Sequence, residues 1–214
     1  MSLEIDKNPN ARNWGYIYSY SGRCIGPDDQ YDSPSIQDIA VSLGRICRYA
    51  GSCVRFFPVL LHSFVVADLV SDHTNKLYAL LHDATECLVG DIPRGFKTDE
   101  ISVVEDIMLK KILKSLSIAS PLASQWEVVK RADNQALIGE IWSVGNVGLR
   151  AYYQGRDMAA EEIVLKYVQQ YPPQECIQPD GLAVIEFVRR FREYSTGATA
   201  KSSVVSEAGG ASIA

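Results

Sequence analysis

Imidazole and carboxylate side chains gather in one apolar stretch of this 214-residue sequence. His82 and Asp83 are adjacent, and Glu86 and Asp91 follow within the next eight positions. Apolar residues bracket these groups: Leu80, Leu81, Cys87, Leu88 and Val89. Because buried carboxylates and imidazoles cost free energy when they lack partners, we expect them to share a cleft with a metal ion that neutralises the carboxylates.

Two residues that are distant in the sequence would complete a metal site with His82 and Asp83. His62 lies in an apolar helical segment, and Asp133 lies where another helical segment changes from basic to apolar. Two imidazoles and two carboxylates suit Mn²⁺, Fe²⁺, Co²⁺, Zn²⁺ or Ni²⁺ without a clear preference. On a six-coordinate ion, such a set leaves positions for water and a phosphoryl oxygen, as metal-assisted hydrolysis requires.

These four residues stand in the order His…His-Asp…Asp, which resembles the ligand order of the HD-domain phosphohydrolases. The resemblance continues in residues 81–86 (Leu-His-Asp-Ala-Thr-Glu) and 90–94 (Gly-Asp-Ile-Pro-Arg). Matching segments occur over residues 14–140. They look like the branch of the superfamily that includes bacterial 5′-deoxynucleotidases and phage dATP-hydrolysing enzymes.

The resemblance implies two catalytic residues. Glu86 and Asp91 match family carboxylates that orient or activate water and protonate the leaving oxygen. Each residue also has a purely structural alternative to the catalytic role. Glu86 would be a carboxylate on a helix face, and Asp91 would be an ordinary turn or capping residue.

Five residues match family positions that bind the nucleotide or its phosphates. They are Arg48, Tyr49, Arg94, Lys97 and Lys130. Cations beside a transferring phosphoryl group stabilise the charge that develops there. Alternatively, Arg48 pairs with the C-terminal dipole of its helix, and Arg94 and Lys97 lie on a solvated loop.

The function that the resemblance implies is metal-dependent removal of phosphate from 2′-deoxynucleotides. We expect dATP, with dADP and dAMP, as the substrates and deoxyadenosine as the product. The role we expect is control of the nucleotide pool in a phage. Mg²⁺ could be bound together with the phosphates. Val41, Leu61 and Tyr49 depart from the family pattern and leave base selectivity open. The alternatives are an HD hydrolase of a signalling nucleotide (ppGpp or a cyclic nucleotide) and a catalytically silent nucleotide-binding scaffold.

Helical periodicity predicts the elements that position these residues. We expect an all-α HD-domain bundle at 35–194, an irregular N-terminal arm at 1–34 packed on it, and a flexible C-terminal tail at 195–214. Residues 14–20 could form a short strand within the arm. The expected helices cover 35–51 (closed by Gly51), 58–70, 75–89 (stopped by Gly90), a segment from 98, 121–144, 157–171 and 181–194.

Composition restricts the partners. The chain has 21 Lys and Arg against 26 Asp and Glu, a net charge of −5 that disfavours binding to a nucleic-acid polymer. Its apolar runs are too short for a membrane span, and we expect a cytoplasmic protein (in the host cytoplasm if phage-encoded). We also expect a homo-oligomer, a dimer or hexamer, formed through residues 126–142 or the C-terminal helices.

The five cysteines include no C-x-x-C pair, so the sequence indicates neither a disulfide framework nor a zinc finger. We expect all five to be small buried apolar residues.

Overall fold

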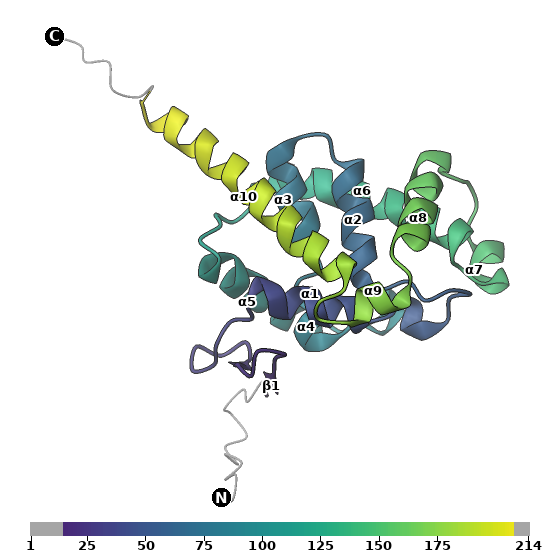
Figure 1. Cartoon of the computed structure of the whole chain (residues 1–214), viewed down its shortest axis with the longest axis horizontal. Helices are drawn as coiled ribbons and strands as arrows, with labels where there is room; N and C mark the ends of the chain where they lie inside the picture. The colour runs from purple at the N-terminus through teal and green to yellow at the C-terminus, as the bar shows by residue number, and fades with distance from the viewer. Residues whose placement is uncertain (1–14, 208–214) are drawn as a thin grey trace, which may run out of the picture.

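The computed structural model describes residues 15–207, and these residues are mostly helical, as the sequence predicts (Figure 1). The elements are β1 (Ile17–Tyr18), β2 (Cys24–Ile25), α1 (Ile36–Arg45), η1 (Tyr49–Gly51), α2 (Val59–Leu69), α3 (His73–Leu81), α4 (Glu86–Val89), η2 (Arg94–Phe96), α5 (Asp99–Ser115), α6 (Ala123–Ser143), α7 (Val147–Tyr152), α8 (Met158–Gln170), α9 (Pro173–Ile177) and α10 (Leu182–Glu207). Within residues 15–207, no helix combines the length and the apolar character needed to cross a membrane.

Helix α2 lies at the centre of the fold and carries His62. All residues from Val59 to Ala67 are buried. A helix that is apolar on every side needs cover on every side, and α1, α3, α6 and α8 all contact α2. Pro58 precedes its first turn, which confirms the predicted start. His62 is therefore held in the apolar interior, where its ring nitrogens require polar partners.

The first predicted helix ends six residues before Gly51, at Arg45. Ile46 is already extended, and its carbonyl accepts a hydrogen bond of 3.0 Å from the Val59 amide at the start of α2. Residues 46–58 consequently fold back as a loop against α2. Gly51 belongs to the one-turn helix η1 inside that loop, so the prediction that it closes α1 is wrong.

The single helix predicted over 75–89 is also wrong, because the structure breaks it at residues 82–85. The hydrogen bonds at the break run to carbonyls three residues back: Ala84 to Leu81, Glu86 to Asp83, and Cys87 to Ala84. This tighter winding separates α3 from α4 at the position of His82 and Asp83. The predicted stop is confirmed, because Gly90 caps α4 with φ +78°.

The remaining predicted helices correspond to α5, α6, α8 and α10, with starts within two residues of expectation. The sequence analysis missed α7 and α9, which have 6 and 5 residues.

Helix α10 runs on to Glu207, so residues 195–207, expected in the tail, are helical. The flexible character of the tail stays a prediction, as does the division into arm, domain and tail, and residues 1–14 and 208–214 lie outside the described part of the chain.

The described part of the arm, residues 15–34, forms the antiparallel pair β1–β2 and contacts the helices. Asp38 in the first turn of α1 accepts hydrogen bonds from the backbone and side chain of Ser21, at 2.7 and 2.9 Å. Lys111 of α5 donates to three arm carbonyls, those of Gly26, Asp28 and Tyr31. The arm therefore lies across the ends of α1 and α5.

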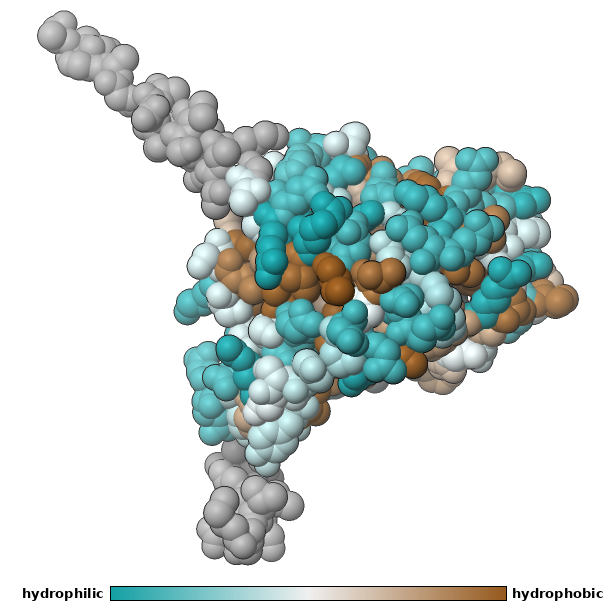
Figure 2. Space-filling model, in the orientation of Figure 1, coloured by the Kyte–Doolittle hydropathy of each residue, from teal (hydrophilic) through white to brown (hydrophobic). Residues whose placement is uncertain are grey.

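Apolar side chains are exposed near the start of α10. Figure 2 shows apolar residues gathered on this face among hydrophilic ones, and Leu182 and Ile185 are 58% and 54% exposed. The expected homo-oligomer stays a prediction.

Helix α6 approaches α8 closely at Gly139. A Cβ added there would lie 2.7 Å from the backbone carbon of Ala160. We therefore expect Gly139→Ala to lower the free energy of unfolding by about 1–3 kcal/mol, because overpacking outweighs the gain in helix propensity. Gly95→Ala is the control, since nothing lies within 4 Å of its added Cβ. Urea titration followed by circular dichroism measures both, and equal midpoints would contradict the tight contact.

Candidate metal centre and active site

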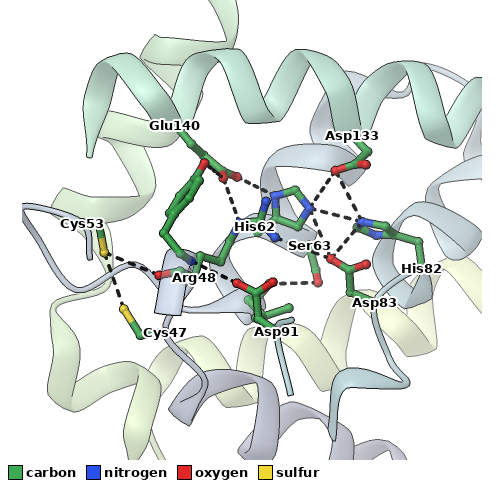
Figure 3. Close-up of polar contacts among 12 residues, drawn as sticks. Cys47, Arg48, Cys53, His62, Ser63, His82, Asp83, Asp91, Asp133 and Glu140 are labelled. Atoms are coloured by element: carbon green, nitrogen blue, oxygen red, sulfur yellow. Dashed lines mark hydrogen bonds and ion pairs between the residues drawn. The ribbon is translucent and has the colours of Figure 1, made fainter. Parts of the chain in front are cut away.

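The four predicted metal ligands converge from α2, the α3–α4 break and α6 (Figure 3). His62 Nε2 lies 3.2 Å from His82 Nε2, 3.4 Å from Asp83 Oδ2 and 3.2 Å from Asp133 Oδ1. His82 Nε2 lies 3.1 Å from Asp83 Oδ2 and 3.9 Å from Asp133 Oδ1. Residues separated by as many as 71 positions thus direct their nitrogen and oxygen atoms at one point.

The outer nitrogens of both imidazoles face acceptors. His62 Nδ1 lies 2.5 Å from Glu140 Oε1, and His82 Nδ1 lies 2.8 Å from the Ala79 carbonyl. Each Nδ1 therefore carries a proton, and the lone pair of a neutral ring is on Nε2. Two such lone pairs 3.2 Å apart, beside carboxylate oxygens, repel one another unless a positive charge lies between them. The donor set fits a divalent metal ion.

Three of the four residues form the tightest group. The ligand atoms of His62, His82 and Asp83 all lie within 4.8 Å of one another and could hold a metal ion. Asp133 reaches both imidazoles, but it is outside this group; its place as the fourth ligand stays a prediction.

The charge balance of the cluster favours a cation. Burial and Arg48 lower the pKa of His62, but Glu140 and Asp133 outweigh them and raise it to about 10. Asp83 likewise raises the pKa of His82 against the effect of burial. Burial raises the pKa of Asp133, yet its hydrogen bond and charge interaction with His62 bring it down to about 2. Without a metal ion, protons therefore supply positive charge to this cluster, and a divalent ion would replace them.

Glu140 is a site residue that the sequence analysis missed. It is fully buried on α6, and besides His62 it accepts hydrogen bonds from Arg48 Nε at 2.9 Å and Tyr49 Oη at 2.8 Å. The sequence contained one indication of its role. Glu140 lies seven residues after Asp133, and this spacing places both carboxylates on the same face of α6. Glu140 thus connects a candidate metal ligand to the loop of residues 46–58.

Arg48 and Tyr49, predicted to bind the nucleotide, lie at the turn of that loop. Tyr49 and Ala50 have φ angles of +58° and +50°, which are strained for residues with a side chain. The Tyr49 amide donates to Asp91 Oδ2 at 3.1 Å. The guanidinium of Arg48 also lies 3.8 Å from Asp83. The loop is thus fixed to both a predicted catalytic residue and a candidate metal ligand.

Glu86, the other predicted catalytic residue, is beside the cluster with an unsatisfied oxygen. Its Oε2 is buried and has no hydrogen-bond partner among the described residues. Burial, with Asp83 and Asp91 nearby, raises its pKa to about 10. A carboxyl group in this environment holds a proton at neutral pH.

Two adjoining pockets, of about 480 and 380 Å³, open over the cluster and share one wall. The shared residues are Asp83, Glu86, Arg94, Lys97 and Asp133. Lys130 lines only the larger pocket, whereas Arg48, Tyr49 and Asp91 line only the smaller one. Every predicted catalytic and substrate-binding residue therefore lines a pocket beside the candidate metal ligands, although their roles stay predictions.

Comparison with known proteins gives one partial match. No family model matches the chain. Over 83 residues it is 40% identical to the uncharacterized protein YfdR of Escherichia coli (strain K12), and this alignment covers 38% of the chain and 46% of the relative. The chain is therefore similar to less than half of that relative, whose name states no activity.

The contacts of Glu140 predict its effect on metal affinity. Glu140→Gln keeps the shape but weakens the hydrogen bond that orients His62, so we expect Co²⁺ to bind about 10–100-fold more weakly. Glu127→Gln is the matched control, because Glu127 is exposed on the same helix. Titration with Co²⁺, followed by visible absorbance, measures both variants; unchanged affinity in Glu140→Gln would show that Glu140 does not support the site.

Proposed function

We propose that this protein is a metal-dependent phosphohydrolase that removes phosphate from 2′-deoxynucleotides. The observation that carries the proposal is the convergence of His62, His82 and Asp83 beneath pockets lined by cationic side chains. The resemblance of residues 81–86 and 90–94 to the deoxynucleotidase branch of the HD-domain phosphohydrolases supports the substrate class.

The donor atoms fit a divalent transition ion held by His62, His82, Asp83 and Asp133. When bound, such an ion would polarise a phosphoryl oxygen and lower the pKa of water. The protein contributes the rigidity of this set, since His62 is fixed by Glu140 and His82 by a backbone carbonyl. Fixed ligands keep the reacting phosphorus in one place relative to the pocket walls.

Proton transfer is assigned to Glu86 and Asp91. Glu86 lies beside the cluster with a buried oxygen, where burial raises its pKa, and it is suited to give a proton to the leaving oxygen. Asp91, across the smaller pocket, lines the wall with a carboxylate that also accepts the Tyr49 amide. Its remaining oxygen is suited to orient water.

Cationic side chains on the pocket walls would bind the phosphates. Arg94 and Lys97 line both pockets, and Lys130 lines the larger one. Lys97 forms an ion pair with Glu105, which holds its ammonium group at the wall. In the smaller pocket, Tyr49 offers an aromatic ring to the nucleoside. We propose dATP, with dADP and dAMP, as the substrates and a homo-oligomer as the active form.

One assay tests the proposed reaction. The purified protein is incubated with Co²⁺ or Mn²⁺ and a panel of dNTPs, dNMPs, NTPs, ppGpp and cyclic nucleotides, and products are resolved by chromatography. We expect deoxyadenosine and phosphate or triphosphate from the deoxyadenine nucleotides. Product from ppGpp or a cyclic nucleotide alone would favour a signalling hydrolase, and no product from any compound would favour a silent binding scaffold.

A substitution at Glu86 separates catalysis from metal binding. Glu86→Gln keeps the size and shape of the side chain, and Glu86 is not among the candidate metal ligands, so we expect normal metal content and stability. Turnover should fall about 10²–10⁴-fold through loss of the proton donor. Glu100→Gln, on the exposed first turn of α5, is the control. Steady-state kinetics with metal analysis decides the matter, and full activity in Glu86→Gln would remove Glu86 from the mechanism.

A further inference from the structure

Two cysteine side chains face each other beside the site. Cys47 Sγ and Cys53 Sγ are 3.5 Å apart (Figure 3). Both are partly exposed, as is Cys24, so the expectation that all five cysteines are buried is correct only for Cys87 and Cys176. The proposed function uses neither member of this pair.

The pair spans the strained turn that carries Arg48 and Tyr49. The chain on either side is braced: the Arg48 amide donates to the Phe57 carbonyl at 3.0 Å, and the Val54 amide donates to the Val144 carbonyl at 2.8 Å. These bonds hold the two sulfur atoms near each other at the base of a turn whose side chains reach the smaller pocket.

The separation of the two sulfur atoms is short enough to favour a disulfide. The sulfur atoms of a disulfide are about 2.05 Å apart, so the pair must close by about 1.5 Å, which is within the range of side-chain rotation. Both cysteines are themselves partly exposed. A thiol or disulfide reagent in solution can therefore reach the pair.

We propose that Cys47 and Cys53 are a redox-responsive thiol pair whose disulfide fixes the turn that carries Arg48 and Tyr49. One thiolate of the pair attacks oxidised glutathione and releases one glutathione thiolate. The second thiolate attacks the resulting mixed disulfide and releases the other. Two protons leave the protein, its thiols lose two electrons, and the oxidant becomes two molecules of reduced glutathione.

The disulfide would act on the site through Glu140. Arg48 and Tyr49 both bond Glu140, and Tyr49 also bonds Asp91. A cross-link over the turn would further restrict Arg48 and Tyr49, which line the smaller pocket. We expect the oxidised protein to show at least threefold lower kcat/KM, an effect that rests on the proposed function.

The thiol pair is tested without reference to activity. The full chain is equilibrated with oxidised and reduced glutathione at mildly alkaline pH, since burial and the Cys47 thiol raise the pKa of Cys53 to about 11. Remaining thiols are blocked, and the protein is digested with trypsin. Cleavage after Arg45, Arg48 and Arg55 places the two cysteines in separate peptides, 46–48 and 49–55.

We expect these two peptides to be found joined, with free thiols falling from five to three per chain. Cys47→Ser should yield no joined peptide, whereas Cys24→Ser should yield as much as the wild type. Five remaining thiols under fully oxidised glutathione, or mixed disulfides in place of the joined peptide, would overturn the proposed pair.

Activity is then measured on the oxidised and reduced forms. A lower kcat/KM that dithiothreitol restores in the wild type, and that is absent in Cys47→Ser, supports control of the site. Equal kcat/KM in both forms overturns that control while the joined peptide still establishes the pair. No turnover in either form counts against the proposed function, and the peptide result remains independent of it.

Discussion

The burial of negative charge beside two imidazoles is the constraint on which the rest of this structure depends. Asp83, Glu86, Asp133 and Glu140 lie around His62 and His82, with Arg48 as the guanidinium partner. Carboxylates in an apolar interior cost free energy unless positive charge is near. The raised pKa values of both imidazoles and of Glu86 show protons meeting that need in the metal-free protein. A divalent ion meets it more completely, because a proton satisfies one lone pair and an ion satisfies several.

Glu140 extends this constraint from the candidate metal ligands to the two pockets beside them. It accepts hydrogen bonds from His62, Arg48 and Tyr49, so one carboxylate holds both a candidate metal ligand and the turn that lines the smaller pocket. The positive φ angles of Tyr49 and Ala50 are backbone strain that this network holds in place. The proposed thiol pair is in the same turn. Formation of a disulfide in this turn would therefore affect the site through the hydrogen bonds of Arg48 and Tyr49 with Glu140.

The sequence predicted the fold class and most helices because their apolar periodicity is local information. It failed at residues 46–58 and 82–85, where contacts with distant segments decide the backbone. The α3–α4 break cannot be read from periodicity, since apolar residues continue through Leu81 and Ala84. Two short helices, α7 and α9, fell below the length at which a helical period can be recognised.

The candidate site was predictable in part for a similar reason. The His-Asp pair and its flanking segments carry a strong local pattern, and the structure brings His62 and Asp133 to it as expected. Glu140 stands alone in an apolar helical run and matches no pattern, although its spacing from Asp133 was visible. Cys47 and Cys53 could not be paired from the sequence, because their approach depends on how the loop of residues 46–58 folds back on α2.

A crystal structure of the protein soaked with Co²⁺, with anomalous diffraction recorded at the cobalt edge, tests the central claim most directly. We expect one strong anomalous peak between His62 Nε2, His82 Nε2 and the Asp83 carboxylate, at about 2.0–2.3 Å from each. The two Nε2 atoms are already 3.2 Å apart, which suits two neighbouring ligands of a six-coordinate ion at these bond lengths, so they should move little. An absent peak at saturating Co²⁺, with the imidazoles still paired to carboxylates, would contradict the account.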